Sequence, residues 1–197
     1  MIPPFLKKYA GIAALACLAA GCASTPSRFY TLNSQAKPAE LPPLALSLIV
    51  GPVTVPAMVD HPQFTVQVSP NRVVQDEFDR WAEPLNDNIA RVLVADLGSL
   101  LGTAQVAKAP TAQFGPAYQV AINVQRFDSF LGKSAELDAL WVIHQPTGTN
   151  HFFGRTVVSE PVTGKDYEAL AAAHSRALAK LSSDIAARIR REVPARP

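Results

Sequence analysis

Residues 118–144 read YQVAINVQRFDSFLGKSAELDALWVIH, and this stretch decides the fold. In its first part apolar and polar positions alternate, and the apolar ones are Tyr118, Val120, Ile122 and Val124. The same period of two returns further on, with apolar positions Ala135, Leu137, Ala139, Trp141 and Ile143. A period of two is typical of strands with one buried and one solvated face. The stretch therefore predicts two strands of an antiparallel sheet.

More strands are predicted on both sides of this stretch. Alternation, or a short apolar run between turn residues, marks residues 28–32, 44–50, 64–68, 72–78 and 152–158. Pro52 and Pro56 cannot donate to a sheet ladder, so the run that begins at residue 44 continues only as broken extended chain. Turn residues at 69–71 and 145–149 predict two hairpins.

Two segments have the periodicity of amphipathic helices. From Leu85 to Leu101 apolar residues recur at spacings of three and four, Pro84 suits the first helical position, and Gly102 suits the end. The opposite face is expected to carry the polar residues Asp87, Asn88, Arg91 and Asp96. A second helix is expected over residues 166–191. The order of elements predicts an α+β fold, an antiparallel β-sheet with two amphipathic helices packed on one face.

Residues 1–21 have the layout of a secretory signal peptide. Lys7 and Lys8 precede an apolar run over residues 9–20, and small residues follow it. The run is shorter than the ~20 residues that a membrane-spanning helix needs. The sequence LAAGCAS at residues 18–24 resembles a lipobox. It predicts cleavage before Cys22 and attachment of acyl chains, such as palmitate, to that residue.

The anchor also suggests a location and a division of the chain. Cys17 offers a second register inside the apolar run, and an ordinary signal peptide that contains cysteines is the alternative. Ala23 follows the anchor, and by resemblance to sorted lipoproteins this favours the periplasmic face of the outer membrane. Residues 22–43 then form the lipid anchor and a Pro-rich tether. Residues 44–193 form a single domain.

Composition excludes several classes of partner. Lys7 and Lys8 belong to the signal peptide, so the mature chain keeps 16 of the 18 Lys and Arg residues against 16 Asp and Glu. A neutral chain gives no electrostatic reason to bind nucleic acid. Cys22 would be the one cysteine of the mature chain, so no internal disulfide can form. The covalent lipid on Cys22 is the one non-protein group that the sequence predicts.

Residues with catalytic or metal-binding chemistry are sparse. The four histidines, His61, His144, His151 and His174, lack metal-ligand spacing, and no G-x-S-x-G motif occurs. His174 lies on an apolar helix stripe and is expected to be a hydrogen-bonded core residue. The carboxylate pairs Asp76/Glu77 and Glu136/Asp138 are expected on solvated faces. The sequence therefore gives an enzyme no positive support, and no metal site is predicted.

Two short segments stand out as candidate binding residues. They are Asp60-His61-Pro62-Gln63 and Arg80-Trp81-Ala82-Glu83-Pro84-Leu85. One interpretation is a surface patch for a partner protein, formed by Asp60, His61, Pro62, Gln63, Arg80, Trp81 and Pro84. The other is structural, because a Trp just before a helix commonly packs over the core.

These segments carry a family resemblance. With RFYTL at residues 28–32, GPVTVP at 51–56, Asn71 and the terminal helix, they resemble the PqiC-like auxiliary lipoproteins of ABC-type and MCE-domain transport systems. The resemblance covers nearly the whole mature chain. His61 departs from it, because the family usually has arginine before Pro-Gln.

The resemblance implies a non-enzymatic docking subunit of an MCE (PqiB-like) intermembrane lipid transport system, which supports membrane integrity. Its partner would be the MCE-domain transport protein. Alternatives are a structural or assembly lipoprotein of another envelope machine, such as a secretion system, and a periplasmic hydrolase. The sequence leaves open whether copies of the chain form a homo-oligomer.

Overall fold

The computed structural model describes residues 25–38, 40–112, 114–147 and 151–193. Its elements, in chain order, are β1 (Arg28–Tyr30), β2 (Leu48–Thr54), β3 (Gln63–Ser69), β4 (Arg72–Trp81), α2 (Leu85–Leu101), β5 (Val106–Lys108), β6 (Tyr118–Phe130), β7 (Ser134–His144), β8 (His151–Pro161) and α3 (Tyr167–Glu192). The predicted signal peptide and Cys22 lie outside the described residues. None of the helices in the described residues is long and apolar enough to cross a membrane.

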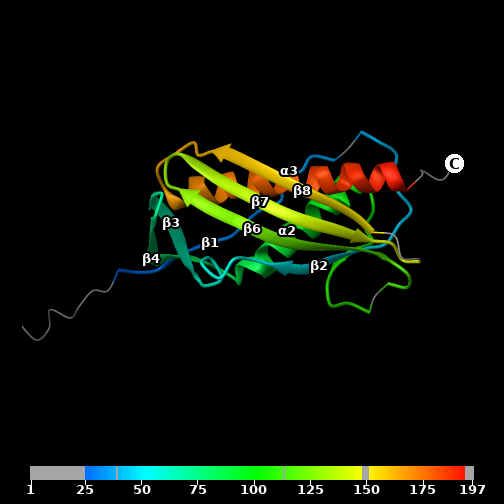
Figure 1. The fold of residues 1–197 in the computed structure, drawn as a ribbon, viewed down its shortest axis with the longest axis horizontal. Helices are drawn as coiled ribbons and strands as arrows, with labels where there is room; N and C mark the ends of the chain where they lie inside the picture. Colours follow the sequence, from blue (N-terminus) through cyan, green and yellow to red (C-terminus); the bar gives the residue numbers. More distant parts are fainter. Residues whose placement is uncertain (1–24, 39, 113, 148–150, 194–197) are drawn as a thin grey trace, which may run out of the picture.

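The strands form two sheets. One has the order β1-β4-β3, and the other has the order β5-β2-β6-β7-β8. In Figure 1 the small sheet lies at one end of the elongated molecule, and the long strands β6, β7 and β8 run from there toward the C-terminal end of α3. Residues 118–144 form the centre of the larger sheet, where β6 and β7 pair in antiparallel fashion from Gln119↔His144 to Phe130↔Ser134.

The α+β fold is confirmed, but the prediction of a purely antiparallel sheet is wrong. β1 is parallel to β4, and β2 is parallel to both β5 and β6. Parallel neighbours need a long crossover, and here the chain between β2 and β6 contains the β3–β4 hairpin, α2 and β5. Alternation reports which face of a strand is buried and carries no information on the direction of its neighbour, so the sequence pattern missed these pairs.

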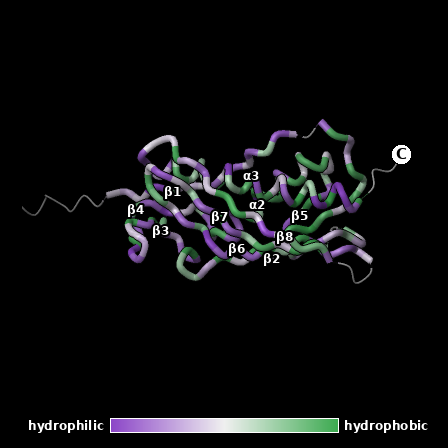
Figure 2. Tube along the Cα trace, turned by 45° about the horizontal axis from the view of Figure 1, so that its top comes forward, coloured by the Kyte–Doolittle hydropathy of each residue, from purple (hydrophilic) through white to green (hydrophobic). Residues whose placement is uncertain are grey.

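Both helices cover one face of the larger sheet. α2 packs against β2 and β5, α3 packs against β7 and β8, and the helices contact each other. Figure 2 shows short hydrophobic and hydrophilic stretches alternating along the chain, as expected for elements with one buried face. The core lies between helices and sheet and includes the fully buried side chains of Leu93, Leu97, Ile143, Leu178 and Leu181.

The ends of α2 follow local backbone rules. Pro84, which the sequence predicted as the first helical residue, is instead the N-cap with an extended ψ of 134°, and α2 begins one position later at Leu85. Gly102 ends the helix in the left-handed conformation, with φ 69°. A Cβ at Gly102 would also meet Pro43 Cα at 3.0 Å. Glycine is therefore required there for conformation and for space.

Two polar residues of α2 are not on its solvent face, which corrects the sequence prediction. Asn88 and Asp96 have no exposed surface. Asn88 Oδ1 accepts from the Leu32 N–H at 3.1 Å. Asp96 accepts from the Ala36 N–H at 3.2 Å and from the Ser182 hydroxyl at 2.9 Å. The helix uses these polar side chains to bind the segment that precedes β2, a partner that helical periodicity cannot reveal.

That segment belongs to the predicted tether, yet it packs on the body. β1 pairs with β4, Leu32 is fully buried, and the Asn33 N–H donates to Ser175 of α3 at 3.1 Å. Farther on, the Pro42 carbonyl accepts from Arg190 at 2.9 Å. The described residues 28–38 and 40–42 therefore follow the two helices, and they are here called the strap. In the described residues only Thr25, Pro26 and Ser27 precede it.

Candidate docking surface

The two segments singled out in the sequence meet in space. The Trp81 N–H donates to the Pro62 carbonyl at 2.7 Å, and Gln63 is paired with Arg80 across the β3–β4 ladder. Between them lies a pocket of about 350 Å³, here called the Trp81 pocket, which is lined by Asp60, His61, Pro62, Trp81, Ala82, Glu83, Pro84 and Leu85. Folding thus joins residues about twenty positions apart into one concave surface. Their role in binding remains a prediction.

The Trp81 side chain belongs mainly to the core. It is 5 % exposed, and its ring lies 4.0 Å from that of Phe64 and 6.3 Å from that of Phe127, centroid to centroid. The structural interpretation of this residue is confirmed, because the indole closes the core just before α2 begins. Among the other residues of the pocket, Asp60, Pro62 and Pro84 are exposed and could be reached by a partner.

His61 is held inside the loop that precedes β3. Its Nε2 lies 2.9 Å from the Met58 carbonyl oxygen, 3.1 Å from Thr65 Oγ1 and 2.9 Å from Gln75 Nε2. Its Nδ1 is buried and has no hydrogen-bond partner. Three neighbours around one nitrogen fix the ring against the hairpin, so His61 shapes the pocket rim from within.

The junction between β4 and α2 is fixed by Arg91. Its guanidinium forms an ion pair with Glu83 at 2.9 Å and also donates to the Leu32 carbonyl at 2.9 Å and to Asn88 at 2.7 Å. Arg80 instead donates to the Glu77 carbonyl at 2.8 Å, along its own strand. The Trp81 pocket is therefore backed by the strap and by α2, which makes it a preformed surface.

A carboxylate-centred network lies beside the pocket, under β1. Asp79 is fully buried and accepts from Arg28 Nε at 2.8 Å and from the Tyr30 hydroxyl at 2.6 Å. Burial, followed by the hydrogen bond to Asp79, raises the pKa of Tyr30 to about 12. Two donors on one buried carboxylate hold β1 on β4, and with it the start of the strap.

His174 is confirmed as a hydrogen-bonded core residue. It has no exposed surface, its Nε2 lies 2.8 Å from Ser129 Oγ, and its ring stacks on Phe127 at 3.9 Å between centroids. Burial lowers the pKa of His174 to about 3. The imidazole is therefore neutral at physiological pH. Its Nδ1 is buried and has no hydrogen-bond partner.

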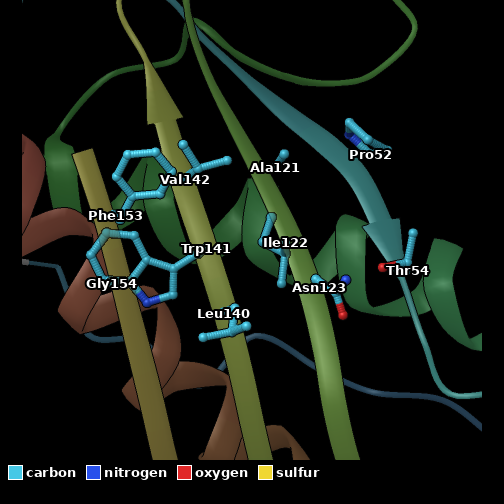
Figure 3. Close-up of a pocket in the computed structure, with 10 residues that line it drawn as sticks. All are labelled: Pro52, Thr54, Ala121, Ile122, Asn123, Leu140, Trp141, Val142, Phe153 and Gly154. Atoms are coloured by element: carbon cyan, nitrogen blue, oxygen red, sulfur yellow. The ribbon is translucent and has the colours of Figure 1, made fainter. Parts of the chain in front are cut away.

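The outer face of the larger sheet carries a second concavity, which the sequence analysis missed. A shallow groove of about 390 Å³ crosses β2, β6, β7 and β8, and its lining is mostly apolar (Figure 3). Leu140 and Phe153 line it and are 44 % and 73 % exposed. The signal was present in β7, because Leu140 and Val142 are apolar at the positions that alternation assigns to solvent.

Two pairs of titratable side chains lie on β7 and β8. His144 and His151 face each other across the β7–β8 pair, with 2.9 Å between their Nδ1 atoms. Asp138 forms an ion pair with Arg155 at 2.7 Å, and this contact lowers the pKa of the carboxyl. In the residues that the structure describes, no group of three or more His, Cys, Asp or Glu side chains could hold a metal ion.

Comparisons with known proteins agree with this architecture. The fold resembles the crystal structure of an uncharacterized protein (TM-score 0.70, 19 % identity, covering 84 % of this chain and 99 % of the other). It also resembles a protein from Xanthomonas campestris (TM-score 0.68, 21 % identity, covering 82 % and 94 %). No curated protein matches the chain. The family model of the ABC-type transport auxiliary lipoprotein component matches residues 30–186. Because this match takes in most of the chain, from β1 into α3, the protein belongs to the family of ABC-type transport auxiliary lipoprotein components.

Proposed function

We propose that this protein is a non-enzymatic docking subunit of an envelope transport system, anchored by lipid on Cys22 to the periplasmic face of the outer membrane. The observation that carries the proposal is the family match over residues 30–186. An auxiliary component of an ABC-type system has a transporter as partner. The finer assignment, to an MCE-domain (PqiB-like) protein in intermembrane lipid transport, rests on the resemblance of the segments at 28–32, 51–56 and 80–85.

The proposed organisation has three parts. Residues 1–21 are removed as signal peptide, Cys22 carries the acyl chains, and the folded body presents the docking surface. Of the predicted tether over residues 22–43, only the part before Arg28 serves as a leash, since the strap packs on the helices. Several acyl chains on one cysteine give near-permanent attachment, because each buried methylene contributes ~0.8 kcal/mol.

The Trp81 pocket is the proposed docking site for the transport partner. It is concave and preformed, its rim exposes Asp60, Pro62 and Pro84, and its floor is apolar. Specific interfaces are centred on such apolar pockets with a polar rim. Asp60 and Glu83 are the acidic residues of the rim, and Arg91 neutralises the charge of Glu83.

Site-specific photo-crosslinking in intact cells tests this proposal. A photo-reactive residue replaces Pro62 or Pro84 in the full-length lipoprotein, and Gln105, exposed and outside the pocket, serves as the matched control. Capture of an MCE-domain protein from positions 62 and 84, and not from 105, is the expected result. Capture of secretion or cell-wall proteins alone would instead favour the assembly role and refute the transport role.

A further inference from the structure

The place where the chain enters the folded body limits how the molecule can sit on a membrane. β1 begins at Arg28, whose guanidinium is bound to Asp79 at 2.6 Å, and β1 pairs with the end of β4. Directly after it, Leu32 is buried and hydrogen-bonded to Asn88. From Arg28 onward the chain is therefore part of the folded body and adds no length to the flexible tether.

The free length left to a lipid on Cys22 is short. Five residues, 23–27, separate Cys22 from Arg28. Six steps of fully extended chain span at most about 20 Å. The 26 residues of α3 alone extend about 39 Å. An acylated Cys22 therefore keeps the β1 end of the molecule within a distance of the headgroups that is about half the length of α3.

Exposed apolar side chains concentrate at this same end. In the described residues ten large apolar side chains are exposed, and five of them belong to the small sheet or the loop that enters it: Phe29, Met58, Val68, Val74 and Phe78. Phe29 is 65 % exposed and pairs with Arg80 of β4. Phe78 lies two positions before Arg80 on β4, so the two side chains are on the same face of that strand. Val68 and Val74 lie at the tip of the β3–β4 hairpin. Figure 1 places this hairpin and the start of β1 at one end of the long axis.

We propose that these five residues, here called the exit surface, rest in the phospholipid headgroup layer of the membrane that holds Cys22. The inference rests on the proposed lipidation of that cysteine. Isolated apolar side chains at an interface bind weakly, but the acyl anchor makes their contact with lipid effectively intramolecular.

The arginines beside the exit surface are paired with carboxylates, so apolar side chains would dominate its contact with the bilayer. Arg28 is paired with Asp79 at 2.6 Å, and Arg80 lies 4.0 Å from the carboxylate of Glu77. Arg72, exposed at the hairpin, is matched in number by Asp76 on the same strand, so the exit surface offers little net charge to anionic lipid. Its contact with the bilayer should change little with salt concentration, whereas a contact made by a basic patch would weaken steeply.

Fluorescence quenching on the intact lipoprotein tests the proposal. The mature chain has no free thiol once Cys22 is acylated, so Val74→Cys, Phe78→Cys and, as control, Phe153→Cys each give one labelling site. Phe153 is 73 % exposed, and it lies eight residue steps from the end of β8 near the exit surface, which is about 26 Å of strand. The purified, acylated variants carry an environment-sensitive dye and are reconstituted in phosphatidylethanolamine vesicles with a minor fraction of phosphatidylglycerol and headgroup-labelled quencher lipid.

The expected result is quenching at positions 74 and 78 several-fold stronger than at 153, at low and at high salt. Equal, weak quenching at all three positions in acylated, vesicle-bound protein would overturn the exit surface and leave the anchor intact. So would stronger quenching at 153. Protein that neither floats with vesicles nor carries acyl mass on Cys22 would overturn the anchor and the inference together. Val74 lies at a hairpin tip, so its variant keeps the test valid if Phe78→Cys unfolds.

Discussion

At the scale of single residues, the Trp81 side chain contributes to core packing, whereas its exposed neighbours are available for partner recognition. The indole is buried against Phe64 and Phe127, while the exposed atoms of the Trp81 pocket belong to neighbours such as Asp60 and Pro62. A substitution of Trp81 therefore removes core volume before it removes any contact with a partner. The rim residues are the ones that report on docking.

Trp81→Ala should lower the free energy of unfolding by about 3–5 kcal/mol, because a large aromatic side chain leaves a cavity in the core. Asp60→Ala, on the exposed rim of the same pocket, should change it by less than about 0.5 kcal/mol. Denaturant unfolding, monitored by far-UV circular dichroism of the backbone, measures the free energy of unfolding of both variants. A Trp81→Ala protein as stable as the wild type would contradict the core role of Trp81 and favour a role of its indole in partner binding.

His174 makes stability depend on pH. Its pKa is about 3 in the folded protein, against the ordinary 6.5 in the unfolded chain. Between these values the unfolded chain binds the proton and the folded protein does not, so acid favours unfolding. The histidine's contribution is fully present above about pH 6.5 and is lost as pH falls toward 3, with a slope of up to about 1.4 kcal/mol per pH unit.

His174→Gln should flatten this dependence, since glutamine can still bond Ser129 and does not titrate. Unfolding free energies of both proteins are compared from about pH 7 to about pH 5.5, a range in which most carboxylates stay ionised. The variant is expected to be less stable at pH 7 but to lose less on acidification. Parallel curves would show that His174 is not the group responsible.

At the scale of elements, the strap is held by polar groups of both helices. Asp96 of α2 binds the Ala36 N–H and the hydroxyl of Ser182 on α3, so one buried carboxylate joins three segments. Helical periodicity placed Asp96 on the solvent face, because its partners are distant in the sequence. Both helices and most strands were predictable, since each repeats its pattern locally; β5 was missed, and β2 lies at Leu48–Thr54 and not at residues 44–50. The order and direction of the strands were not, because they depend on contacts between distant segments.

Asp96→Ala should release the strap. Its loss leaves buried donors without an acceptor, which costs about 1–3 kcal/mol for each group, more when the acceptor was charged. Hydrogen exchange at Leu32, Asn33 and Ala36 should accelerate in the variant. Asp87→Ala, in an exposed ion pair with Lys108, is the matched control on the same helix and should leave these amides protected. Unchanged protection in Asp96→Ala would mean that β1 and Leu32 hold the strap without it.

At the scale of the whole molecule, the strap determines how the proposed anchor and the proposed exit surface would act together. Because the strap packs on the helices, a lipid on Cys22 would be a short connection to one end of the body. The Trp81 pocket lies where β4 passes into α2, next to that end, so the proposed docking site would be presented close to the membrane. The anchor, the two pocket segments and a strand at residues 28–32 were predicted from the sequence. The rest of the strap was expected to be free tether, because Pro-rich polar chain has no periodicity that reveals packing.

Lengthening the leash tests this arrangement. Insertion of about 20 Gly and Ser residues between Ser27 and Arg28 lengthens the free chain from six steps to about 26, which lowers the local concentration of the exit surface at the membrane about ninefold. Lipid quenching of a dye at position 78 should fall several-fold in the acylated protein. The same linker added after Pro197 leaves the leash unchanged and should leave the quenching unchanged. Equal quenching in all three proteins would show that the short leash does not govern contact between the exit surface and lipid, and that the surface binds the membrane by its own affinity.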